Sequence, residues 1–155
     1  MPELDKSKVD TFIYLQRLTV SGDFAGEFDV PLIKRAISNL LGNATRVGGY
    51  FEARMQALED LPLIGQVRGR KLMLCVESVA NKATKALLPD EVNESKRISN
   101  VAEGMGLIVR PIGHLNVMSP PLMITEGDVD FIAETLEKAI RIVTDDLVRE
   151  GVRLG

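Results

Sequence analysis

Residues 106–125 read GLIVRPIGHLNVMSPPLMIT, and this stretch decides the predicted fold. Two short apolar segments, residues 107–110 and residues 115–118, are typical of β-strands. The four residues between them, PIGH, suit a turn that joins adjacent antiparallel strands. Pro120 and Pro121 then close the second strand, because proline has no backbone N–H to give to a sheet. The stretch therefore predicts an antiparallel pair of strands.

A long amphipathic helix follows this pair. Thr125 and Asp128 form an acidic variant of the capping box, which marks the start of a helix. From there apolar residues recur at helical spacing as far as Arg149. The predicted buried stripe consists of Val129, Ile132, Leu136, Ala139, Ile140, Val143 and Leu147.

Upstream, the pattern predicts one helix and one strand. Residues 92–105 carry an apolar stripe, and Gly106 is a suitable C-terminal stop. Residues 67–79 form a dense apolar run that predicts a single strand covered on both faces. A polar connection, residues 80–91, joins the two elements.

Two further apolar stripes predict helices between Asp29 and Leu58. Asp29 can cap the first, Pro31 falls in its first turn, and Gly42-Asn43 can end or kink it. The second stripe is interrupted by Gly48-Gly49 and ends before Pro62. Residues 1–28 contain apolar residues without a clean period.

The order of elements is helix, helix, strand, helix, strand, strand, helix. This order predicts an α+β fold, in which helices pack on one small and mainly antiparallel sheet. We expect residues 40–155 to form this domain. We treat residues 1–39 as an N-terminal extension that the patterns do not assign to it.

Composition excludes several classes of function. Hydrophobic residues make up 45% of the 155-residue chain and charged residues 26%, so a globular core is expected. The net charge is -3 and no basic block occurs, which argues against nucleic-acid binding. The apolar runs are too short to cross a bilayer, and the first residues lack the pattern of a signal peptide. We therefore expect no membrane association and a cytoplasmic location.

A self-contained catalytic or metal site is not predicted. The one histidine, His114, rules out a pair of histidine ligands, and we interpret it as a solvated turn residue. The one cysteine, Cys75, lies in an apolar run and is interpreted as an inert core thiol. No Gly-rich phosphate loop followed by lysine occurs. We assign no catalytic, cofactor-binding or metal-binding residue.

Arg110 is the candidate substrate-binding residue. It ends an apolar strand beside Pro111, where an unpaired guanidinium is costly to leave among apolar groups. Its planar fork can bind a carboxylate through two parallel hydrogen bonds. The residues alone leave two alternatives open, a structural salt bridge and a clamp for a carboxylate ligand.

Five collinear motifs stand out: YFEAR at residues 50–54, LPLIGQVRG at 61–69, VANKATK at 79–85, GLIVRPIG at 106–113 and SPPLMITE at 119–126. These motifs resemble the C-terminal small domain of the class III aminotransferases, which depend on pyridoxal phosphate. They extend over about two-thirds of the chain, in the order found in that family. Within the family, the motifs look most similar to those of amine–pyruvate and ω-amino-acid transaminases.

The resemblance implies a role for Arg110. In such enzymes the arginine at this place binds the carboxylate of an amino or keto acid, such as pyruvate, and swings aside for an apolar amine. The resemblance also implies a homodimer, or a separate large domain that binds pyridoxal phosphate, as the partner of this chain.

The chain departs from the family in one decisive respect. Family members are longer, and their large domain carries the lysine that forms a Schiff base with the cofactor. No lysine here lies in such a motif, so we expect no cofactor on this chain alone. Three hypotheses follow: a piece of a transaminase, an inactive truncated product, and a non-catalytic module for carboxylate binding or dimerisation.

Overall fold

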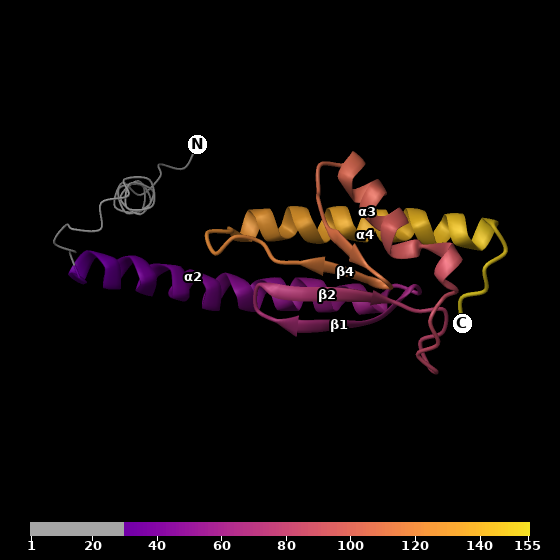
Figure 1. Ribbon diagram of the computed structural model, residues 1–155, viewed down its shortest axis with the longest axis horizontal. Helices are drawn as coiled ribbons and strands as arrows, with labels where there is room; N and C mark the ends of the chain where they lie inside the picture. Colours follow the sequence, from indigo (N-terminus) through magenta and orange to yellow (C-terminus); the bar gives the residue numbers. More distant parts are fainter. Residues whose placement is uncertain (1–29) are drawn as a thin grey trace. The chain divides into compact units, whose positions relative to one another are not determined.

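The computed structural model describes residues 30–155 as three α-helices, two 3-10 turns and a four-stranded sheet (Figure 1). Two compact units divide the chain between Gly42 and Asn43, and the second carries the sheet. The α+β fold is confirmed. The features predicted before residue 30, including the Asp29 cap, lie outside the described residues. The elements are α2 (Val30–Gln56), η1 (Ala57–Asp60), β1 (Ile64–Arg70), β2 (Met73–Ser78), η2 (Asp90–Val92), α3 (Glu94–Gly104), β3 (Arg110–Ile112), β4 (Leu115–Met118) and α4 (Glu126–Arg149).

The two predicted N-terminal helices form one continuous helix, α2, of 27 residues. The prediction of a break at Gly42-Asn43 is wrong. A Cβ atom added at the buried Gly48 would lie 2.9 Å from Cβ of Lys71. Gly48 is therefore a contact residue, which lets the helix backbone approach the turn after β1, and it does not interrupt the helix.

The predicted single strand over residues 67–79 is also wrong. The chain turns at Lys71-Leu72, and β1 and β2 form an antiparallel hairpin whose last pair is Arg70 with Met73. Gly69 makes this possible, since its φ of 117° lies where side chains are rarely tolerated. Lys71 also has a positive φ, of 56°. The turn contains no proline or asparagine, so the sequence gives no turn signal within the apolar run.

The sheet is antiparallel throughout, with strand order β1-β2-β4-β3. Within residues 30–155, only one of its faces is covered. On β2 the buried residues Leu74 and Val76 alternate with Met73, Cys75 and Glu77. We call the face of these last three residues the outer face. The prediction that both faces of this segment are covered is wrong. It is based on the apolar character of the whole run, but the apolar residues Met73 and Cys75 lie on the outer face.

The covered face belongs to a core shared with three helices. α2 contributes Val47, Phe51 and Met55 to it, and α3 contributes Ile98 and Ala102. α3 packs on α4 (Figure 1). The stripe predicted for α4 is buried, apart from the half-buried Ile132. Each fully buried leucine or isoleucine contributes about 1.5–3 kcal/mol.

The limits of α3 and α4 agree with their sequence signals. Gly106, with a φ of 90°, follows the end of α3. The capping box of α4 is complete: the Asp128 amide donates to Thr125 Oγ1 at 3.2 Å, and the Thr125 amide donates to Asp128. The hydrogen bonds from Thr125 lower the pKa of Asp128. No helix within residues 30–155 combines the length and the apolar character needed to cross a bilayer.

The hairpin turn gives a test of the fold. We expect Gly69→Ala to destabilise the protein by about 2–4 kcal/mol, because strain at a positive φ adds to a steric clash. The new Cβ atom would lie 2.0 Å from the Met73 carbonyl oxygen. Urea unfolding measures the loss.

Gly104→Ala is the matched control, since nothing lies within 4 Å of its added Cβ atom at the end of α3. This variant should be neutral or stabilising by up to about 1 kcal/mol. Equal stabilities for Gly69→Ala and Gly104→Ala would contradict the hairpin geometry.

Candidate functional site

Arg110 begins β3, the strand at one edge of the sheet. The predicted strand over residues 107–110 is shifted in the structure, where β3 covers Arg110–Ile112 and the turn is reduced to Gly113-His114. Arg110 pairs with Val117, which pairs in turn with Cys75, opposite Arg68. Since directly paired residues share a face, Arg110 lies on the outer face.

A small cavity adjoins Arg110. Its volume is about 230 Å³, and Arg110 and Ser119 are its hydrogen-bonding side chains. A guanidinium beside an apolar surface suits a small anion that has an apolar part. The other lining residues come from the segment before β3, from β4 and the residues after it, and from α4: Leu107, Ile108, Val117, Met118, Pro120 and Ile132.

The Arg110 side chain is exposed, and none of the ion pairs formed among residues 30–155 includes it. Other arginines of the same region are paired. Arg97 binds Glu150 through two hydrogen bonds of 2.8 and 2.7 Å, and Arg68 binds Glu77 at 2.6 Å. The salt-bridge alternative for Arg110 therefore has no acidic partner within the described part of the chain.

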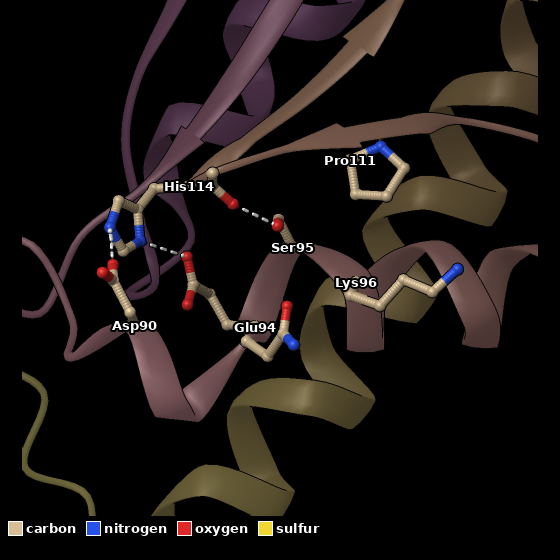
Figure 2. A pocket seen from close by; sticks show the side chains of 8 residues that line it. Asp90, Glu94, Ser95, Lys96, Pro111 and His114 are labelled. Carbon is tan, nitrogen blue, oxygen red and sulfur yellow. Dashed lines mark hydrogen bonds and ion pairs between the residues drawn. The ribbon is translucent and has the colours of Figure 1, made fainter.

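A second and more polar cavity, of about 570 Å³, lies between the start of α3 and the β3–β4 turn (Figure 2). His114 lines it between two carboxylates, with Nδ1 2.9 Å from Glu94 and Nε2 3.4 Å from Asp90. Glu94 is only 1% exposed. The interpretation of His114 as a solvated turn residue is wrong, because the buried Glu94 holds its ring. Glu94 gave no signal in the sequence beyond an acidic residue at a helix start.

Cys75 is not a core residue. It is half-buried on the outer face, between the buried Leu74 and Val76. The apolar run suggested burial of every member, whereas strand geometry turns alternate residues to opposite faces.

The YFEAR motif, residues 50–54, has a structural role. Tyr50 donates a hydrogen bond to Asp130 at 2.7 Å, and Arg54 donates to the same oxygen at 2.8 Å. These contacts join the end of α2 to α4. The hydrogen bond to Asp130, which favours the protonated phenol, raises the pKa of Tyr50.

Residues 30–140 match the model of the aminotransferase class III family. This match covers more than half of the 155 residues. The chain belongs to the class III aminotransferases. The predicted resemblance is thereby confirmed, and Arg110, Tyr50 and the start of α4 all fall within the matched segment.

Individual relatives agree with this assignment. The chain is 40% identical to an uncharacterized aminotransferase of Sinorhizobium fredii, over 75% of this chain and 26% of the relative. It is 35% identical to the diaminobutyrate–2-oxoglutarate transaminase of Halomonas elongata, over 84% of this chain and 28% of the relative. The structure resembles that of an omega-transferase from Vibrio fluvialis with a TM-score of 0.70 and 34% identity, over 72% of this chain and 27% of that one.

The chain thus spans about a quarter of the length of these relatives. It corresponds to a fragment of a class III aminotransferase, as the small-domain resemblance predicted. Structures of the family include one described as PLP-bound (internal aldimine) and one described as PMP-bound, so pyridoxal phosphate is the cofactor of these relatives. The predicted division at residues 39 and 40 stays a prediction.

Proposed function

We propose that this chain supplies the small domain of a transaminase that transfers an amino group between an amine or amino acid and a keto acid such as pyruvate. In this proposal Arg110 binds the substrate carboxylate. The observation that carries it is an exposed arginine without an acidic partner among residues 30–155, beside a largely apolar cavity. The guanidinium can bind the carboxylate of a small keto acid, and the apolar cavity lining can contact the rest of that molecule.

The described residues do not fit pyridoxal phosphate. Of the two cavities described above, only the 570 Å³ cavity is lined by a lysine, Lys96. That cavity has no phenylalanine or tyrosine ring to stack on a pyridine, and Asp90 and Glu94 would repel the phosphate. Lys82 and Lys85 donate to backbone carbonyls, of Leu61 at 3.2 Å and Gly65 at 2.6 Å. We therefore propose that the cofactor is held by a large domain from another source.

The second candidate function is a non-catalytic module that binds small carboxylates or dimerises. The outer face favours association, because Met73 is 71% and Ile112 52% exposed there. Directly paired residues place the half-buried Leu115 and Val117 on the same face. We propose a symmetric homodimer as the association of the isolated chain. Light scattering that shows a monomer over a wide concentration range would refute it.

Binding of pyruvate tests the role of Arg110. One charge-assisted contact supplies about 1.5–3 kcal/mol, whereas millimolar affinity requires about 4 kcal/mol. The isolated chain should therefore bind pyruvate at millimolar affinity or more weakly, and Arg110→Ala should remove this binding. Amide chemical shifts followed by NMR during a pyruvate titration, at constant ionic strength, measure both.

Stability separates the clamp from a structural strut. Arg110→Ala should change the free energy of unfolding by less than about 0.5 kcal/mol, since the side chain is exposed. Arg97→Ala, which removes the pair with Glu150, should cost about 0.2–1 kcal/mol and leave pyruvate binding intact. A loss of about 3–5 kcal/mol for Arg110→Ala would show a buried ion pair and refute the clamp.

The absence of a cofactor lysine gives a further prediction. The purified chain, mixed with pyridoxal phosphate, should form no stoichiometric imine and should not transaminate. Absorption spectra before and after borohydride reduction, followed by peptide mapping, measure this. Reduction of one imine per chain at a single lysine would contradict the proposal that another domain holds the cofactor.

A further inference from the structure

The strand that carries Arg110 receives little support from its own sheet. β3 has three residues and lies at the sheet edge, so within residues 30–155 it pairs with β4 alone. Its central residue, Pro111, has no backbone N–H to donate. The position of the Arg110 backbone therefore depends on contacts from outside the sheet.

Two serines of α3 supply such contacts. Ser99 Oγ donates a buried hydrogen bond to the Val109 carbonyl at 3.0 Å. Ser95 Oγ donates to the Gly113 carbonyl, a contact that Figure 2 shows. Ser95 is 1% exposed and Ser99 6%. Because they are four residues apart on a helix, both lie on the same side of α3. They hold the residues directly before and after β3.

Two further contacts fix the same hairpin. Asn116, which pairs with Pro111, donates from Nδ2 to the Ser95 carbonyl at 2.9 Å. In the turn itself, His114 lies against the buried Glu94 (Figure 2). The hairpin is thus attached to the first half of α3 by polar groups at both ends.

We propose that Ser95 and Ser99 are positioning residues for Arg110, an inference that rests on the proposed function of Arg110. They bond to the backbone on both sides of β3, and none of the contacts described for them involves the Arg110 side chain. Their hydroxyl groups fix the point from which the guanidinium extends. Without Ser99 the buried Val109 carbonyl loses its donor, and without Ser95 the part-buried Gly113 carbonyl loses its donor, so the short strand shifts to find others.

Ser99→Ala is the principal variant. We expect its pyruvate dissociation constant to rise about three- to ten-fold, since small displacements of a binding group lower its effectiveness sharply. Ser99→Thr keeps the hydroxyl and should restore binding to within about two-fold of the wild type. Asn100→Ala, at the neighbouring exposed position on α3, is the control and should bind pyruvate as the wild type does.

Ser95→Ala provides a second variant with the same expected weakening, and it does not depend on whether the buried site of Ser99 accepts the methyl group of threonine. All titrations use the full chain, under conditions where circular dichroism shows each variant to be folded. Amide hydrogen exchange in residues 110–117 should accelerate in Ser99→Ala, whereas exchange in α4 should not.

The outcomes separate the two proposals. If Arg110→Ala removes pyruvate binding but Ser99→Ala and Ser95→Ala bind normally, the positioning role is refuted and the proposed function stands. If Arg110→Ala binds pyruvate as the wild type does, or the wild type shows no binding, the proposed function fails and the positioning role with it. Weaker binding by both serine variants, with the Asn100 control unchanged, supports the positioning role.

Discussion

The structure depends on a sheet that the helices of residues 30–155 cover on one face only. Strand geometry turns alternate side chains to opposite faces, so burial of Leu74 and Val76 on β2 sends Cys75 and Glu77 outward. The antiparallel register carries this choice from β2 through β4 to β3. Arg110 of β3 lies on the outer face because Leu74 and Val76 of β2, two strands away, are buried on the opposite face. The position of the candidate site is thus a consequence of how the core packs.

The long periodic elements could be predicted, and the tight turn could not. α4 has a complete capping box and a clear apolar stripe, and its predicted ends agree with the structure. The β1–β2 hairpin turns at Lys71-Leu72, in a run whose outward residues, Met73 and Cys75, are as apolar as its inward ones. The sequence of this run therefore shows no alternation of polar and apolar residues that would indicate a strand with one exposed face. Gly69 was visible in the sequence, but its positive φ is a property of the folded turn.

Arg110 could be chosen from the sequence because its chemistry belongs to the residue and to a recognisable motif. Its surroundings could not. Ser99 and Val109 are 10 residues apart, Ser95 and Gly113 are 18, and Glu94 and His114 are 20. Two serines and a glutamate in the first turns of a helix have an ordinary explanation as residues suited to a helix start. Only the packing of α3 against the hairpin shows that their partners lie elsewhere.

A fixed backbone and a free side chain together explain what Arg110 can and cannot do in this chain. Ordering an arginine side chain costs up to about 2 kcal/mol of conformational entropy, which is comparable with the roughly 1.5–3 kcal/mol gained from one charge-assisted contact. Since the Arg110 backbone is held at both ends of β3, the remaining entropy cost is mainly that of the side chain itself. The surplus is small, so in its proposed role Arg110 would select carboxylates without holding them tightly. Tight binding would then require further groups around the same ligand, and in the proposed function these come from the large domain.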